Sequence, residues 1–413
     1  MPINLDNNAT TQPSPGVASA VARTLSELWH NPSSVHRGGQ AARQAVELAR
    51  QQVAQLIHAK PREIVFTSGG TEAIDLAIRG TLAALPNPVA PRAKPRNIVT
   101  TKVEHSAVRD LAEELNRTHA VEVRWAGLDR GGILTPESLV ASLDADTALV
   151  CVQWANNETG AIQPIAALYA ECTKRNIPML CDGTQWVGKM PTDVSENAAL
   201  FDLLIFSPHK FHGPKGVGVL WSRRGMRLRP SIHGTQELGR RGGTENVPGI
   251  VGAGVAAEEA AAWLEVQSRR EAQAALRDRF ERAVLAEISE ARVNGPSDAA
   301  LESDPSLESS PISLDLRSRL WNTTNIAFPK LEAEALLLLL SERGLFASAG
   351  AACSSGSLDP SPVLLAMGVS PELAHGSLRF SLSKHTTRDD IDAALALVVQ
   401  AVRTLRQSSS SVA

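Results

Sequence analysis

Apolar and polar residues follow two different periods along the first half of the chain. Apolar runs of strand length occur at residues 64–66, 97–101, 121–125, 148–154, 179–181, 201–206 and 217–221. Apolar residues at helical spacing occur at 16–29, 39–59, 70–82, 105–118, 136–143 and 164–176. From residue 64 onward the two kinds of stretch alternate. This pattern predicts βαβ units, and so an α/β fold with a mainly parallel central sheet and helices on both faces.

The second half of the chain has a different pattern. An Ala-, Arg- and Glu-rich stretch from 249 to about 290 predicts one long helix that bridges two lobes. Strand patterns follow at 324–328 and 377–382, with helical patterns at 332–343 and 388–405. We therefore expect an N-terminal arm (1–15), a large domain (16–260) and a smaller α+β domain (261–413). Residues 86–95 and 297–318 read as exposed segments, and 407–413 as a disordered tail.

Composition excludes several classes of partner. The 413 residues carry a net charge of −3, and only 4% are aromatic, with Tyr169 the single tyrosine. These values argue against nucleic-acid and membrane partners. The longest apolar run, 335–340, is too short for a membrane span, and the start has no secretion signal, so we expect a cytoplasmic protein. The four cysteines lack metal-site spacing, and no metal is expected.

A lysine-bearing turn separates the last two strands of the predicted sheet. It reads Ser207-Pro-His209-Lys210-Phe-His212-Gly213-Pro-Lys215-Gly216-Val-Gly218. The chain has nine lysines against thirty-two arginines, so two lysines in one turn are noticeable. An amine that forms a Schiff base must be lysine, because arginine keeps its proton. A solvated lysine on a surface turn is the alternative reading.

Polar residues follow the carboxyl ends of the predicted strands, where open α/β sheets bind ligands. These residues are Thr71, His105, Asn156, Asn157, Asp182, Gln185, Ser207, His209 and Lys210. Each one also has an ordinary explanation as a helix cap or loop residue. In Thr67-Ser-Gly-Gly-Thr71-Glu72, a strand meets a helix through two glycines, and free N–H groups at such a helix start suit a phosphate. A plain helix cap at Thr71 is the alternative.

An amine, a carboxylate and a phosphate cradle are what pyridoxal phosphate requires. Lys210 supplies the amine, Asp182 the carboxylate for the pyridinium nitrogen, and the start of the helix at Thr71 the donors for the phosphate.

With these residues in hand, the chain resembles the cysteine desulfurases of the NifS/IscS type, in the class V aminotransferase group of fold-type I pyridoxal phosphate enzymes. The resemblance covers nearly the whole chain, in the family's order. It rests on Leu5-Asp-Asn-Asn-Ala-Thr-Thr11, Asn31-Pro-Ser-Ser-Val-His36, Phe66-Thr-Ser-Gly-Gly-Thr-Glu72, Glu104-His105, Asn156-Asn-Glu-Thr-Gly160, Asp182-Gly-Thr-Gln185, Ser207-Pro-His-Lys210, Arg240-Arg-Gly-Gly-Thr-Glu-Asn246, Gly350-Ala-Ala-Cys353-Ser and Leu378-Arg-Phe-Ser-Leu382.

The resemblance implies a role for each matching site residue. Lys210 would bind the cofactor covalently and move the Cα proton, Asp182 would pair with the pyridinium nitrogen, and Gln185 and Asn157 would bind the phenolic oxygen. His105 would stack on the ring and, as a catalytic residue, protonate an intermediate. Gly70, Thr71, Ser207 and His209 would hold the phosphate, with Thr244 reaching it from the other subunit of a homodimer. Arg379, with Asn157, would bind the substrate carboxylate.

Cys353 lies among small residues, in Ala347-Ser-Ala-Gly-Ala-Ala-Cys353-Ser-Ser-Gly-Ser357. The resemblance implies that Cys353 takes sulfur from L-cysteine as a persulfide, leaving L-alanine, and passes it to an acceptor protein for iron–sulfur cluster, tRNA or other cofactor synthesis. Three positions depart from the family pattern: Gly183, Trp321 and Ser383-Lys-His385. A selenocysteine lyase or other class V enzyme, and a non-catalytic sulfur-transfer subunit, are the alternatives.

Overall fold

The computed structural model describes residues 2–85, 95–196, 198–296, 319–349 and 359–410. Its strands are β1 (Ile3–Asn4), β2 (Ile64–Thr67), β3 (Asn97–Thr100), β4 (Glu122–Trp125), β5 (Thr147–Gln153), β6 (Met179–Asp182), β7 (Leu203–Phe206), β8 (Gly218–Ser222), β9 (Arg292–Val293), β10 (Thr323–Ala327), β11 (Leu345–Phe346) and β12 (Ser377–Ser381).

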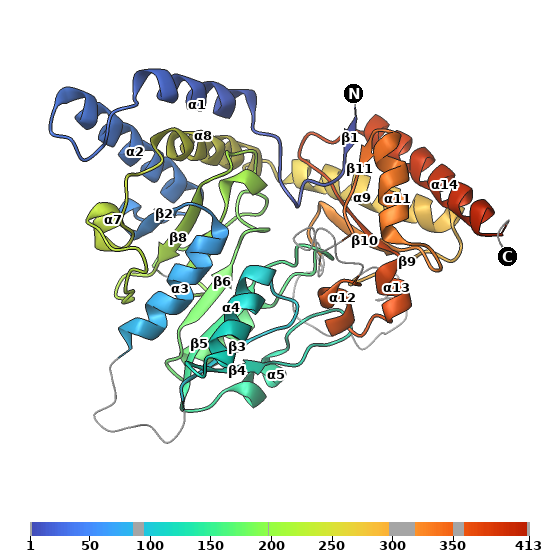
Figure 1. Ribbon diagram of the computed structural model, residues 1–413, viewed down its shortest axis with the longest axis horizontal. Helices are drawn as coiled ribbons and strands as arrows, with labels where there is room; N and C mark the ends of the chain where they lie inside the picture. Colours follow the sequence, from blue (N-terminus) through green and yellow to red (C-terminus); the bar gives the residue numbers. More distant parts are fainter. Residues whose placement is uncertain (1, 86–94, 197, 297–318, 350–358, 411–413) are drawn as a thin grey trace.

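Helices connect and cover these strands (Figure 1). They are α1 (Pro15–Glu27), α2 (Arg37–Leu56), α3 (Gly70–Ala84), α4 (Ser106–Arg117), α5 (Pro136–Ser142), α6 (Ile165–Thr173), α7 (Gln236–Gly239), α8 (Val247–Leu264), α9 (Gln267–Glu287), α11 (Ala333–Glu342), α12 (Pro362–Ala366), α13 (Pro371–His375) and α14 (Arg388–Ser410), with 3-10 turns η1 (Pro61–Glu63) and η2 (Pro208–Lys210).

The central sheet has seven strands in the order β2-β8-β7-β6-β5-β3-β4. All run parallel except β8, which is antiparallel to both of its neighbours. Side chains of a strand alternate between the two faces, and both faces here are apolar. In β5, Val150 and Val152 pack in the core beneath α2 and α8, whereas Leu149 and Cys151 pack in the core beneath α3 and α4. The predicted mainly parallel sheet with helices on both faces is confirmed.

A second, smaller unit is built on the antiparallel sheet β12-β10-β9. Helices α9, α11 and α14 supply its core, in which the rings of Phe280 and Phe380 meet edge to face with centroids 4.9 Å apart. Among the described residues, no helix is long and apolar enough to cross a membrane.

The N-terminal arm joins the two units. β1 pairs in parallel with β11, and Asp6 forms a bridge with Ser381 of β12. Figure 1 shows the arm, in dark blue, leaving the smaller unit and crossing to α1 on the large one. The sequence predicted an extended arm, but its partner strands were not anticipated.

The single long helix expected from 249 to about 290 is wrong. The chain forms two helices, α8 and α9, and Val266 between them has extended backbone angles. α8 packs on α1 and α2, whereas α9 packs on β10 and α14, so the chain must change direction between two cores. The expected tail is wrong in part, because α14 continues to Ser410.

Some expectations stay predictions. The boundary proposed at residue 260 falls inside α8, and the division into domains is untested. The segments expected to be exposed, 86–95 and 297–318, lie almost entirely outside the described residues.

Candidate active site

Lys210 lies at the carboxyl edge of the sheet, on the short connection from β7 to its antiparallel neighbour β8. β7 ends at Phe206, and η2 follows directly. The Lys210 side chain turns toward the N-terminal arm, where its Nζ donates to the backbone oxygens of Asn8 (2.8 Å) and Ala9 (2.9 Å). The amine is therefore held at the sheet edge rather than extended into solvent.

The arm also hydrogen-bonds to the backbone of the lysine turn. Thr11 donates from its N and its Oγ1 to the His209 oxygen, both at 2.9 Å, and accepts at Oγ1 from the His212 N at 2.7 Å. His209 Nδ1 contacts the Thr10 hydroxyl at 3.0 Å. Burial, and then the charge of Lys210, lower the pKa of His209 to about 3, so its ring is neutral at neutral pH.

Asp182 and Gln185 follow β6, the strand next to β7. The Asp182 carboxylate is 7% exposed and accepts from the Thr184 N at 2.9 Å, which fixes the orientation of the carboxylate. Gln185 is 4% exposed, and its Nε2 donates to the Asn8 oxygen at 3.1 Å. Lys210 and Gln185 thus share one acceptor, so the structure brings them together as the sequence predicted.

A cradle of small groups lies where α3 begins. A Cβ added to Gly70 would stand 2.7 Å from the Ser207 Oγ, so a larger residue would force the Ser207 hydroxyl to move. Ser207 is buried, and Thr71 is exposed beside it in the first turn of α3. Unpaired N–H groups of a helix start, together with a hydroxyl, suit a phosphate.

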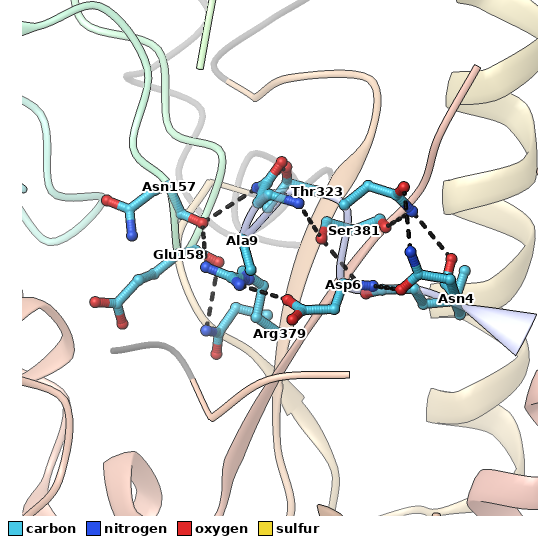
Figure 2. A network of polar contacts seen from close by, with 12 residues as sticks. Asn4, Asp6, Ala9, Asn157, Glu158, Thr323, Arg379 and Ser381 are labelled. Carbon is cyan, nitrogen blue, oxygen red and sulfur yellow. Dashed lines mark hydrogen bonds and ion pairs between the residues drawn. The ribbon is translucent and has the colours of Figure 1, made fainter. Parts of the chain in front are cut away.

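His105 and Asn157 lie at the ends of two further connections. His105 caps α4, and its Nδ1 accepts from the Ala107 N at 3.1 Å, which leaves any single ring proton on Nε2. The Asn157 backbone oxygen accepts from Asn8 Nδ2 at 3.1 Å and from Arg379 at 3.0 Å. Figure 2 shows the Asn157 side chain extending away from these contacts.

Arg379 comes from β12 of the smaller unit and is 2% exposed. It pairs with Asp6 of the arm at 2.6 Å as well as with the Asn157 oxygen, and Figure 2 shows these groups gathered around it. The smaller unit thus presents a guanidinium to the same edge of the large sheet.

Two predicted site residues stay predictions. Thr244 is exposed on the loop of residues 234–246, so the single chain does not test its expected reach toward another subunit. Cys353 lies outside the described residues. Downstream of it, the Ser361 hydroxyl donates at 2.5 Å to the buried Glu158 carboxylate, which ties the start of α12 to the turn that holds Asn157.

Sequence reasoning missed Lys189, which is 5% exposed. Its Nζ donates to Gln185 Oε1 at 2.6 Å and to Asn8 Oδ1 at 2.9 Å. Burial, and then the charges of Lys210 and Arg379, lower the pKa of Lys189 well below its usual range, and a neutral amine has two N–H bonds for these two acceptors. Gly188, at φ 78°, directs Lys189 inward, and a Cβ there would meet the Phe211 ring at 2.4 Å. The rarity of lysine in the chain was the available signal.

Glu104 precedes His105 in the connection between β3 and α4. It is 1% exposed and accepts from Thr101 Oγ1 at 2.8 Å. Burial, reinforced by the charge of Asp182, raises the pKa of Glu104 to about 8 despite the Thr101 hydrogen bond. Glu104 is therefore mostly protonated at neutral pH.

The Trp321 departure also bears on this cluster. The Trp321 indole donates to the Lys189 backbone oxygen at 3.0 Å and is 2% exposed, so it helps to fix the Lys189 segment.

The residues present fit the cofactor that the resemblance implies. An amine (Lys210), a buried carboxylate (Asp182), an imidazole (His105) and the start of a helix (Gly70) lie at one sheet edge. Among the described residues, no cluster of His, Cys, Asp and Glu has the arrangement of a metal site.

Known cysteine desulfurases are similar to this chain over nearly its whole length. The chain is 43% identical over 408 residues to a cysteine desulfurase of Nostoc sp., covering 98% of this chain and 94% of that protein. It is 40% identical to the cysteine desulfurase NifS of Azotobacter vinelandii, with the same coverage.

Solved structures agree with these relatives. A NifS-like protein superposes with a TM-score of 0.84 at 32% identity, covering 98% of this chain and all of that one. A structure described as SspA in complex with cysteine has a TM-score of 0.71 at 28% identity, covering 93% and 99%. The profile of the aminotransferase class-V family matches residues 3–394, and the chain belongs to that family.

Proposed function

We propose that the chain is a pyridoxal phosphate-dependent cysteine desulfurase that converts L-cysteine to L-alanine. The observation that carries the proposal is the meeting of Lys210, Gln185 and Asp182 at adjacent strand ends, facing the buried guanidinium of Arg379. Relatives named cysteine desulfurase at 40–43% identity over nearly the full length support it.

The proposed roles are those that the family resemblance implies. Lys210 would carry the cofactor, Asp182 would pair with its ring nitrogen, and Gln185 and Asn157 would bind its phenolic oxygen. His105 would stack on the ring. Gly70, Thr71, Ser207 and the neutral His209 would hold the phosphate, with Thr244 reaching it from a second subunit.

Arg379 binds the carboxylate of the substrate. Because Arg379 already contacts Asp6 and the Asn157 oxygen, its guanidinium is oriented before substrate arrives. A planar guanidinium can give a carboxylate two parallel hydrogen bonds, and this fixes the direction of the amino acid.

When bound, pyridoxal phosphate withdraws electrons from the Cα of an amino acid attached to it. The amine of Lys210 takes the proton from Cα. The thiolate of Cys353 attacks the substrate sulfur, so that an S–S bond forms as the substrate Cβ–S bond breaks. Proton return to the carbon skeleton gives L-alanine, and the sulfur stays on Cys353 as a persulfide.

We propose a cytoplasmic homodimer that passes this sulfur to an acceptor protein, for iron–sulfur clusters or another sulfur-containing product. Relatives named cysteine desulfurase match this chain over 98% of its residues, which supports an enzyme rather than a binding subunit. A selenocysteine lyase differs in a testable way, since it does not need Cys353.

The test follows L-alanine and sulfide from L-cysteine with the purified protein. We expect a visible cofactor absorption band and alanine formation in wild type. Lys210→Ala should lose the covalent cofactor and about 10³-fold or more in rate. Cys353→Ala should keep the absorption band and lose alanine formation.

Cys172→Ala is the matched control, because Cys172 is a buried thiol on α6 and plays no part in the proposed site. Equal alanine formation by Cys353→Ala and Cys172→Ala would remove the persulfide step and favour a lyase. A wild-type protein without a cofactor band would favour the non-catalytic subunit.

A further inference from the structure

We propose that Asn8 of the N-terminal arm is a positioning residue that holds Lys210 and Gln185 in register with the substrate-binding side of the site. The inference rests on the proposed function for the roles of those residues. Asn8 is 1% exposed, and each of its four polar atoms is hydrogen-bonded.

The backbone oxygen of Asn8 determines the positions of two side chains on the cofactor side. It accepts from Lys210 Nζ at 2.8 Å and from Gln185 Nε2 at 3.1 Å. The two donors come from different connections of the central sheet, after β7 and after β6. One carbonyl therefore sets their separation, and a shift of the arm would move both.

The side-chain oxygen of Asn8 fixes that carbonyl in place. Oδ1 accepts from Lys189 Nζ at 2.9 Å and from Asn322 Nδ2 at 2.9 Å. Lys189 also donates to the Gln185 oxygen, so Gln185 is held from both ends of its amide. Asn8, Gln185 and Lys189 therefore form a closed ring, in which each residue is hydrogen-bonded to the other two.

The two nitrogens of Asn8 reach the substrate side. Nδ2 donates to the Asn157 oxygen at 3.1 Å and to Thr323 Oγ1 at 2.9 Å, and the backbone N donates to Ser381 Oγ at 2.9 Å. Figure 2 shows Thr323, Ser381, Asn157 and Arg379 around this part of the arm. The Asn157 oxygen also accepts from Arg379, so Asn8 links the amine side to the guanidinium side through its backbone oxygen and its side-chain amide.

Only a primary amide of this length meets these demands. Aspartate lacks the donor for the Asn157 oxygen, and its charge beside Lys189 would favour the ammonium form of that amine. Alanine would leave Asn157, Thr323 and Asn322 each with one hydrogen bond fewer in a buried place.

The test measures the accessibility of the Lys210 amine in full-length, cofactor-free protein, by brief reaction with acetic anhydride and mass spectrometry. Exposed Lys215 is the internal reference. We expect Lys210 of Asn8→Ala to be labelled about five-fold faster relative to Lys215, the scale of one lost hydrogen bond of ordinary strength. A merely structural role would not change this ratio in a protein whose circular dichroism is unaltered.

Asn7→Ala is the matched control, because Asn7 is a neighbouring buried amide whose Nδ2 binds the oxygens of Asn4 and Ser381. It weakens the arm's attachment to β12 without touching the closed ring, so its labelling ratio should stay near wild type. An equal ratio in both variants, or no change in Asn8→Ala, overturns the proposal. If Asn8→Ala does not fold, Asn8→Ser is measured instead. We expect its Lys210 to be labelled about two-fold faster relative to Lys215, and an unchanged ratio would contradict the proposal.

Activity separates this inference from the function itself. A wild type that forms no alanine from L-cysteine removes the proposed function, whatever the labelling shows. An active wild type with equal labelling of Lys210 in all variants removes only the role of Asn8. If the proposed function and the role of Asn8 both hold, Asn8→Ala should lower kcat by about ten-fold, whereas Asn7→Ala should keep the wild-type kcat.

Discussion

Two segments are held against the central sheet by buried side chains, one of them charged and the other neutral. The loop of residues 234–246 is held by a charge: Glu237, 6% exposed, accepts two hydrogen bonds from Arg50 at 2.7 and 2.8 Å and one from the Phe66 N at 2.9 Å. The N-terminal arm is held at its centre by the neutral amide of Asn8.

The difference follows from what lies nearby. The nitrogens beside Asn8 belong to Lys210 and Lys189, and a carboxylate there would stabilise their charged forms and add to the negative charge of Asp182. The loop contacts no such amine through Glu237, so an ion pair can fix its backbone. That backbone is in the left-handed region at Glu237 (φ 49°) and Leu238 (φ 58°), which few side chains adopt without support. A charged side chain can hold a segment whose backbone conformation is unfavourable. A neutral side chain is needed beside a reactive amine, because a carboxylate there would favour the charged form of the amine.

The largest expected effect comes from breaking the charged anchor. Glu237→Ala leaves the Arg50 guanidinium buried without its carboxylate, and we expect the free energy of unfolding to fall by about 3–5 kcal/mol. Urea unfolding monitored by circular dichroism measures the change.

Arg50→Met combined with Glu237→Leu is the matched control, because it removes both charges at similar volume. We expect it to recover much of the loss. A Glu237→Ala variant as stable as wild type would show that the loop is held by something other than this ion pair.

Next in size is the pH dependence that Lys189 gives to stability. Burial lowers the pKa of its amine in the folded protein well below the value of about 10.4 that it has in the unfolded chain. The unfolded state therefore binds more protons, and this contribution to stability is lost as pH falls and regained as pH rises. Lys189→Met removes it, so between pH 7.5 and 9.5 wild type should gain up to about 1.4 kcal/mol per pH unit relative to the variant.

Urea unfolding of the cofactor-free protein at several pH values checks the difference. The groups facing the amine are Asn8 and Gln185, with the charges of Lys210 and Arg379 acting on it. Lys174→Met is the control, because that lysine is exposed and pairs with Glu171 on the surface. Parallel curves for wild type and Lys189→Met would mean that the buried amine keeps its proton.

The smallest expected effect concerns the second ion pair of the loop. Arg241 and Glu72 meet at 2.7 Å, with side chains 20% and 19% exposed. Arg241→Gln should lower the free energy of unfolding by about 0.5–1 kcal/mol, because a partly exposed pair is screened by water. A loss of stability comparable to that of Glu237→Ala would show that the two ion pairs hold the loop equally strongly.

Much of the sheet and its edge could be predicted from the sequence. Strands such as 148–154 are apolar on both faces, which is a strong signal, and the carboxyl-end rule then places Asp182, Gln185 and Lys210 together. The break at Val266 was missed because no Gly or Pro marks it, although the composition changes there from the apolar, Ala-rich α8 to the charged, Arg-rich α9, and the two helices pack on different cores.

Asn8 and Lys189 were missed for a related reason. A polar arm and a lysine after glycine both look solvated in sequence, since burial of a polar group depends on partners far along the chain. Asn8 meets its partners from residue 157 to residue 381, and no local pattern reports such distances.

The pairing of the arm with the last strand of the smaller unit also bears on the order of folding. Asn8 and Ser381 are 373 residues apart, so the arm leaves the ribosome first and must wait for nearly the whole chain before its partner strand exists. The core of the large unit can assemble during synthesis, whereas the arm's bridge to β12 can form only after that strand emerges. The guanidinium of Arg379, on the same strand, is therefore among the last groups to be set in place, and a nascent large unit has no complete site.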